Sequence, residues 1–348
     1  MKKILAVVLG AILFCTGIFV LSACGNDQPE GGTQVSVYAP DGAPALALAQ
    51  LMSEDMQFGG TVTYNVVAAN TIQTYVTGNA PKADIAVLPV NAAAMLLGKG
   101  DTYQMLGAVT HGNLYVLSAK HTETLKADNL AQSLAGSKIG CLQLENFVGY
   151  ALRAVLSNYG IAYEVRSDKN ESNDTQSAYL YPVEGTEITP AADYDYMIAA
   201  EPAVTKKVNA TASAAKPLTV VGDLQGLYGE QGYPQAVLVA KKSLIEENAK
   251  FIDDFTKAVD ESAAWILDEG TSAKTIYDAV VGHFADKQMS PTFSESDLTK
   301  AVIGRCAVRF DAAQDCKARV TEFLSELSEA AGKTFSASDA FFYTGTVD

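Results

Sequence analysis

Three successive strand–loop–helix units open the globular part of this chain, and they limit its possible folds more than any other feature. Residues 35–38, 61–67 and 83–88 have the apolar or alternating patterns of β-strands. Each is followed by a short loop and a run with helical periodicity, at residues 45–52, 71–77 and 92–97. Repeated alternation of this kind predicts an α/β fold with a parallel sheet.

Two segments depart from this alternation and indicate a second domain. Apolar strands at 104–109 and 114–119 flank residues 110–113 with no helix between them, and 234–240 mirrors this pattern later. Between these segments runs a new α/β series, with strands at 138–142, 162–166, 194–198 and 218–221 and helices at 147–159 and 201–208. We therefore expect a two-lobed α/β fold with the ligand cleft between the lobes. Two crossing strands would join lobe I (34–116 plus 235–348) to lobe II (117–234).

The remainder of the chain has helical periodicity and is expected to pack on lobe I. Its predicted helices cover residues 249–268, 272–284, 294–306 and 311–331. The polar segment 167–176, rich in Asp, Asn and Ser, is predicted to be a surface loop.

The N-terminus has the order of a bacterial secretory signal that ends in a lipid-modified cysteine. Two lysines precede an unbroken apolar run over residues 4–20, and Leu-Ser-Ala then leads into Cys24. We predict a signal peptide over 1–23, diacylglycerol on the Cys24 thiol and a flexible tether over 24–33. The alternative is an uncleaved transmembrane anchor, for which the apolar run is short. Both the cleaved signal with its lipid and the uncleaved anchor would place the globular part on the extracytoplasmic side of the cell membrane.

Composition excludes several classes of partner. The chain has 40 acidic and 25 basic residues, and cleavage of the signal leaves 23 basic residues and a net charge of −17. Acidity of this size opposes nucleic acid and anionic lipid as partners, so contact with the membrane is expected through the lipid anchor alone. About 325 residues would remain, 48% of the whole chain being apolar, which suits two domains with proper cores.

No cofactor or metal is predicted. The chain has no Gly-rich phosphate-binding loop of the Gly-x-x-x-x-Gly-Lys-Ser/Thr form, so it carries no ATP site of that type. Its three histidines, His111, His121 and His283, do not pair at the spacing of metal ligands.

Three cysteines, Cys141, Cys306 and Cys316, lie outside the signal and the lipidation site. On one continuous helix Cys306 and Cys316 would be about 15 Å apart, too far for a disulfide. Residues 307–310 look extended, and 311–314 have the form of a capping box that starts a new helix. Such a break can bring the two thiols together on the oxidising side of the membrane. The sequence is therefore compatible both with a Cys306–Cys316 disulfide and with two free thiols.

Four stretches, taken in their order, carry a resemblance to a known family. They read APDGAPAL at 39–46, ADIAVLPVN at 83–91, HGNLY at 111–115 and AAEPAVT at 199–205. The chain resembles type II periplasmic solute-binding proteins, in the branch that binds sulfonates, taurine and thiamine-precursor pyrimidines. This resemblance implies two lobes that close over a small solute, with an ABC permease and its cytoplasmic ATPase as partners. By analogy with such tethered receptors we expect a monomer. The pocket loops show no evident cationic residue, which leaves the class of solute open.

The candidate ligand contacts follow the predicted strands or lie in the crossings. Helix N-termini there offer free backbone N–H groups to anions, and asparagine amides both donate and accept hydrogen bonds. The candidates are Asp41, Gly42, Ala43, Asn70, Thr71, Pro89, Asn91, Thr110, His111, Asn113, Asn146, Phe147, Glu201 and Tyr228.

Each candidate also has a structural interpretation. Asparagines often cap helices or form turns, and Asp41 suits either a ligand amine or a cap of its own loop. His111 suits either ligand contact or a backbone tether, and Glu201 suits either contact or an ordinary helix-start carboxylate. Tyr228, with Tyr233, forms either an aromatic wall over a ring or an edge of the core.

Three classes of function are compatible with this sequence. The first is solute capture for an importer, and the second is a sensory or scaffold lipoprotein of the same fold, which the sequence does not distinguish from the first. The third, which the resemblance implies because the same fold also serves pyrimidine synthesis, is an enzyme of thiamine-pyrimidine type with His111 and Cys141 as a base–nucleophile pair. Cys141 lies in an apolar strand, which is typical of an inert thiol, and no second group is placed to orient His111. We therefore expect no catalysis.

Overall fold

The structure is a computed structural model that describes residues 33–168, 174 and 176–345. The predicted signal peptide, Cys24 and the tether up to residue 32 lie outside these residues, as does much of the predicted loop 167–176. Within the described part, no helix combines the length and the apolar character that crossing a membrane requires.

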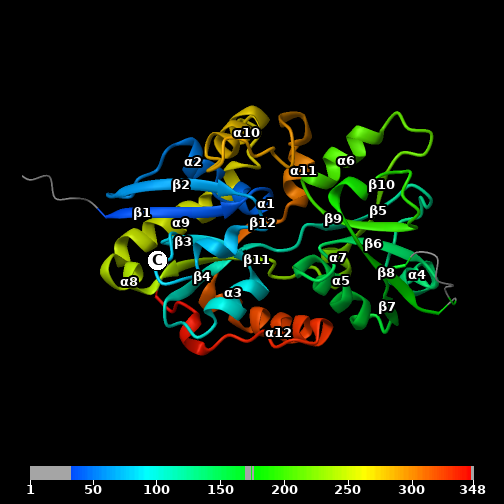
Figure 1. Ribbon diagram of the computed structural model, residues 1–348. Coiled ribbons are helices and arrows are strands. Elements are labelled where there is room, and N and C mark those ends of the chain that lie inside the picture. The colour runs from blue at the N-terminus through cyan, green and yellow to red at the C-terminus, as the bar shows by residue number, and fades with distance from the viewer. Residues whose placement is uncertain (1–32, 169–173, 175, 346–348) are drawn as a thin grey trace, which may run out of the picture. The chain divides into compact units, whose positions relative to one another are not determined.

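Lobe I is built on a six-stranded mixed sheet with the order β12-β4-β11-β3-β1-β2 (Figure 1). Its strands are β1 (Gln34–Pro40), β2 (Thr61–Val67), β3 (Ile85–Pro89), β4 (Tyr103–Thr110), β11 (Ala236–Lys241) and β12 (Val308–Ala312). β1 runs parallel to β2 and β3, whereas β11 is antiparallel to β3 and β4, and β12 is antiparallel to β4. The predicted parallel sheet is therefore only its β2-β1-β3 part, because the strands that return late in the chain enter it in the opposite direction.

Both faces of this sheet are buried, which explains why its central strands are apolar throughout. Leu88 and Val237 face one hydrophobic cluster, and their neighbours Val87 and Leu238 face another. The first cluster lies under η1 (Ile72–Tyr75), α3 (Val90–Leu97) and α12 (Ala313–Ala331). The second lies under α1 (Ala43–Leu46), α2 (Ala49–Ser53), α8 (Lys242–Glu247), α9 (Ala249–Trp265), α10 (Ala273–Gly282) and α11 (Lys300–Arg305).

Lobe II is built on a second six-stranded sheet with the order β10-β5-β9-β6-β8-β7. Its strands are β5 (Leu114–Ser118), β6 (Lys138–Leu142), β7 (Tyr163–Val165), β8 (Ala178–Val183), β9 (Tyr196–Ala200) and β10 (Thr219–Asp223). Its helices are α4 (Leu130–Leu134), α5 (Phe147–Asn158), α6 (Ala203–Thr211) and α7 (Leu224–Tyr228). The structure thus has the predicted two-lobed α/β fold.

The chain changes sheet at the two predicted crossings. It passes from β4 to β5 through residues 111–113 and returns from α7 to β11 through residues 229–235. The predicted lobe boundary at residue 116 falls inside β5, whereas the change of sheet occurs just before that strand. The two crossings touch, because a Cβ on Gly232 would overlap the backbone oxygen of His111. Gly232 also has a φ of 62°, in the region that favours glycine.

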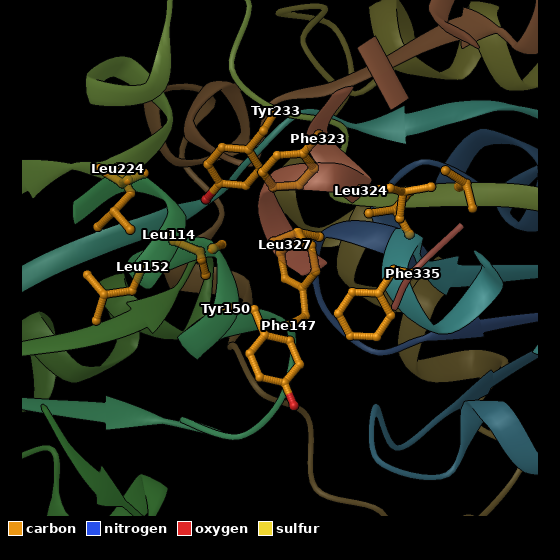
Figure 2. Close-up of a cluster of buried hydrophobic side chains, with 14 of the residues drawn as sticks. Leu114, Phe147, Tyr150, Leu152, Leu224, Tyr233, Phe323, Leu324, Leu327 and Phe335 are labelled. Atoms are coloured by element: carbon orange, nitrogen blue, oxygen red, sulfur yellow. The ribbon is translucent and has the colours of Figure 1, made fainter. Parts of the chain in front are cut away.

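Helix α12 is a further connection between the lobes. It packs against β4 and α3 of lobe I and against α5 of lobe II. One buried cluster therefore continues from lobe I into lobe II, and Figure 2 shows its centre around Tyr233, Phe323 and Leu327.

The disulfide is not formed, because Cys306 and Cys316 are both free and buried. Residues 308–310 are extended as predicted and belong to β12, a strand of the lobe I sheet, whereas Ala307 precedes that strand with a φ of 49°. Cys306 packs in the cluster on one face of this sheet and Cys316 in the cluster on the other face. The capping box is also absent, since Ala312 precedes the helix without a side-chain cap.

Candidate functional site

A cavity of about 490 Å³ lies between the lobes, at the carboxyl ends of β1, β3, β6 and β9. Lobe I lines it with residues 40–44, Pro89, Ala236 and Thr292. Lobe II lines it with Leu114, Phe147 and the segment 199–203, among others. Loops at the carboxyl ends of strands are the usual ligand site of open α/β sheets, and most of this lining is apolar.

Asp41 is placed in the cavity wall by the turn between β1 and α1. The turn requires Gly42, whose φ of 105° favours glycine. Asp41 is only 8% exposed, and its Oδ2 accepts a 2.8 Å hydrogen bond from the backbone N–H of Thr292. Burial raises the pKa of Asp41, and the backbone N–H groups of Thr292 and Gly42 and the charge of Lys206 oppose this shift. The Oδ1 atom is buried and has no hydrogen-bond partner among the described residues.

Glu201 also lines the cavity, but its carboxylate is already bound. Its Oε1 accepts hydrogen bonds from the Arg305 guanidinium at 2.7 and 2.9 Å and from the Thr205 hydroxyl at 2.8 Å. Its Oε2 accepts the backbone N–H of Thr205 at 2.9 Å. Glu201 thus fits the helix-start interpretation and, through Arg305 of α11, it also connects the two lobes.

Two lysines that the sequence did not single out line the cavity from the first turns of α6. The Lys206 Nζ donates to the backbone oxygen of Pro291 in lobe I at 2.9 Å. The Lys207 Nζ donates to the backbone oxygen of Gly185 at 2.6 Å. The sequence showed no evident cationic residue in the pocket loops, and these two lysines lie on a helix instead. One signal could have revealed these lysines: they lie shortly after Glu201-Pro202, on the helix that begins at the cavity.

Asn113 joins the two crossings at the back of the cavity. Its side chain donates to the backbone oxygen of Glu201 at 2.6 Å and accepts from the Gln235 amide at 2.6 Å. Gln235 in turn accepts from the Asn113 backbone N–H at 3.1 Å. With these hydrogen bonds Asn113 holds the hinge, and it lines the cavity as well.

His111 points away from the cavity, toward β12 and α12. Its Nε2 lies 3.2 Å from the Arg309 backbone oxygen and 3.6 Å from an Asp311 carboxylate oxygen, and Arg319 approaches its Nδ1 at 3.3 Å. Burial lowers the pKa of His111 to about 4. These contacts fit the tether interpretation. Burial also raises the pKa of the Cys141 thiol to about 12, so that thiol stays protonated at neutral pH.

The structure brings half of the candidate contacts to the cavity wall. The residues that line it are Asp41, Gly42, Ala43, Pro89, Asn113, Phe147 and Glu201. The described lining does not include Asn70, Thr71, Asn91, Thr110, His111, Asn146 or Tyr228. Asn70 and Asn146 are exposed, and Tyr228 packs against Tyr233 and Phe323 at the edge of the shared core. No group of three or more His, Cys, Asp or Glu residues in the described part of the chain is arranged to hold a metal ion.

Several solved structures share this architecture. An ABC transporter from Parabacteroides distasonis matches with a TM-score of 0.65 at 19% identity, over 90% of this chain and 100% of that one. A Staphylococcus aureus ligand-binding component of an ABC-type import system, with zinc bound, matches with a TM-score of 0.56 at 10% identity, over 89% and 96%. The alkanesulfonate-binding protein SsuA from Xanthomonas axonopodis pv. citri, bound to MOPS, matches with a TM-score of 0.54 at 12% identity, over 85% and 93%.

Comparisons of sequence give no such match. No protein-family model matches the chain, and no curated protein matches it. At the identities of the solved structures the likeness establishes the fold, which is the two-lobed α/β fold of those binding components.

Proposed function

We propose that this chain is an extracytoplasmic, lipid-anchored solute-binding protein that captures a small polar organic solute and delivers it to the permease of an ABC importer. The observation that carries the proposal is the cavity of about 490 Å³ between the lobes. Its volume suits a small organic molecule, and it lies where α/β folds bind ligands. The structures of similar fold from Parabacteroides distasonis and Staphylococcus aureus, which are described as an ABC transporter and as a component of an ABC-type import system, support the same function.

The arrangement of the lobes supports capture by closure. Two short segments, 111–113 and 229–235, carry the chain between the sheets. Polar contacts join the lobes beside the cavity, including Glu201 with Arg305 and Lys206 with Pro291. Such contacts form when the lobes approach, so a solute enclosed between them would favour the closed form. Cys24 would keep this receptor at the membrane that contains its permease.

Solute binding can be tested by thermal unfolding of the full chain in detergent. Intrinsic fluorescence of its 16 tyrosines and one tryptophan would report unfolding in the presence of sulfonates, amino acids, polyamines, nucleobases and pyrimidines. A solute at 100 times its Kd stabilises the native state by about 2.7 kcal/mol, which corresponds to a Tm rise of about 5 °C.

A matched pair of variants places the binding in the cavity. Ala69 is exposed and lines the cavity, so Ala69→Trp should fill part of it and remove the shift. Ala212 is exposed at the far end of α6, so Ala212→Trp should leave the shift unchanged. A panel without any stabilising solute, or a full shift in the Ala69→Trp variant, would contradict the proposed function.

A further inference from the structure

The loop between β6 and α5 forms much of the cavity wall on the lobe II side. Leu142 and Gln143 line the cavity where the loop leaves β6, and Phe147 and Val148 line it where α5 begins. Asn146, the residue before α5, makes no side-chain cap that would fix the loop to the helix. The shape of this wall therefore depends on the other contacts that hold the loop.

Close packing places this loop directly on α5. A Cβ on Gly149, in the first turn of the helix, would overlap the backbone oxygen of Leu144. Only glycine allows an approach this close. The backbone oxygens of Leu144 and Glu145 thereby come within reach of side chains farther along α5.

Two side chains of α5 bind these backbone oxygens. The Arg153 Nη2 donates to the Leu144 oxygen at 3.3 Å and also to the Glu145 carboxylate. The Tyr150 hydroxyl donates to the Glu145 backbone oxygen. The Lys333 Nζ, from the segment after α12, donates to the Tyr150 hydroxyl at 2.8 Å. Because an ammonium only donates, the tyrosine proton remains for the Glu145 oxygen.

Stability alone does not explain why an arginine is buried behind this loop. Arg153 is 6% exposed, and its Nε is buried without a hydrogen-bond partner among the described residues. Its partner Glu145 has a side chain that is 63% exposed, so water screens this ion pair. An apolar side chain of similar length would avoid the cost of the unpaired N–H. What the guanidinium supplies, and an apolar side chain does not, is a donor to the Leu144 oxygen.

Resting on the proposed function, we propose that Arg153 and Tyr150 are positioning residues for solute capture. The described cavity lining includes neither of them, so they act through the loop, which they keep in the position that completes the lobe II wall. Without them the loop would populate other positions, and the apparent Kd would rise in inverse proportion to the fraction of molecules that are competent to bind. The loss therefore falls on solute affinity more than on the stability of the fold.

Calorimetric titration of the full chain in detergent tests this role with one probe for each class of the thermal panel. The probes are taurine, L-leucine, putrescine, adenine and cytosine. For the probe that binds most tightly to the wild type, Tyr150→Phe should raise Kd about fivefold and Arg153→Met about tenfold. Arg153→Lys keeps a donor for the Leu144 oxygen and should raise Kd less than Arg153→Met.

Tyr159→Phe is the matched control. Tyr159 directly follows α5, and its hydroxyl donates to the Leu227 backbone oxygen at 2.8 Å. Each of the two Tyr→Phe variants thus loses a hydrogen bond from a tyrosine hydroxyl to a backbone oxygen of lobe II, and the two should lower Tm by similar amounts. Only Tyr150→Phe should change Kd, because neither Tyr159 nor Leu227 belongs to the described cavity lining.

Amide hydrogen exchange of residues 143–149 reports on the loop without any solute. Exchange in this segment should be about tenfold faster in Tyr150→Phe and in Arg153→Met than in the wild type, and unchanged in Tyr159→Phe. The probe that binds should slow it again, because it selects the position of the loop that is competent to bind.

The outcomes separate this proposal from the proposed function. If a probe binds to Tyr150→Phe and Arg153→Met as tightly as to the wild type, the positioning role is wrong and solute capture stands. The same conclusion follows if Tyr159→Phe weakens binding as much as Tyr150→Phe, or if exchange of residues 143–149 is unchanged in both loop variants. If no solute of the panel binds to the wild type, the proposed function fails and this proposal fails with it.

Discussion

The lobes of this protein meet in two regions of opposite character. The cavity side is joined by polar contacts in which exposed side chains of α6 take part: Lys206 donates to the Pro291 backbone oxygen, and Asn209 donates to the carboxylate of Asp297. The hinge side is joined by stacked aromatic rings inside the core, where the ring centroids of Phe323 of α12 and Tyr233 are 5.0 Å apart (Figure 2). Both of these rings are fully buried.

This difference indicates which contacts can be broken when the two lobes separate. Groups near the surface exchange a protein hydrogen bond for one to water at a small net cost, whereas separating packed rings exposes apolar surface or leaves a void. Among the cavity-side contacts, the pair formed by Glu201 and Arg305 is the costly one, since the Glu201 side chain is fully buried. We infer that the lobes separate on the cavity side while α12 keeps its packing on both lobes.

The largest expected effect belongs to the hinge side. Phe323→Ala removes a ring that contacts Phe147, Tyr228 and Tyr233, and should lower the free energy of unfolding by about 4 kcal/mol. Urea titration followed by fluorescence measures this loss. Ser325→Ala, at an exposed position of the same helix, is the control and should change stability by less than about 0.5 kcal/mol. A loss below about 1 kcal/mol for Phe323→Ala would show that α12 is not part of the core that joins the lobes.

The hinge side should also make the fold sensitive to acid, through His111. Burial lowers its pKa to about 4, with Arg309 and Arg319 adding to the shift and Asp311 opposing it. Its pKa in the unfolded chain is about 6.5. Below pH 6.5 the folded state therefore binds fewer protons than the unfolded chain. The stability that depends on a neutral His111 is fully present above pH 6.5 and is lost as the pH falls from 6.5 to 4. The expected loss is about 3 kcal/mol.

His111→Gln isolates this effect. The variant should be less stable than the wild type at pH 7.5, since it loses contacts with β12 and α12, but the difference should shrink by about 3 kcal/mol as the pH is lowered to 4. His121→Gln is the control, because the His121 side chain is 44% exposed and lies in lobe II away from the hinge. Parallel pH profiles for His111→Gln and the wild type would assign the acid sensitivity to other groups.

The sequence predicted the parts of the fold that depend on local pattern. The alternating strand of residues 61–67 was predicted with its bounds, and the absence of a helix between residues 109 and 114 revealed the first crossing. β8 was not predicted: it contains Pro182 and follows a polar segment, and both features are unfavourable signals for a strand. The break of the first predicted helix between α1 and α2 was missed as well, because residues 45–52 have helical periodicity throughout.

The site was predictable only where its residues follow strands. Asp41, Pro89 and Glu201 lie directly at strand ends, so the α/β pattern alone directed attention to them. Arg305 and Thr292 could not be found in this way, since they reach the site from a segment some hundred residues or more from their partners. Their proximity depends on how α11 and the preceding loop pack on lobe I, which local periodicity does not encode.

The smallest expected effect tests the cavity side. Asn209 of α6 donates a 2.8 Å hydrogen bond to an Asp297 carboxylate oxygen, and Asn209 is exposed. The hydrogen bonds from Ser294 go to the other carboxylate oxygen of Asp297, its Oδ2. Asn209→Ala therefore removes the donor to Oδ1 of a buried carboxylate and should lower the free energy of unfolding by about 1 kcal/mol. Urea titration would compare it with Ser213→Ala, at an exposed position of lobe II just after the end of α6. A loss for Asn209→Ala as large as that for Phe323→Ala would mean that the cavity-side contacts are as integral to the fold as the aromatic core, and the lobes could not separate there.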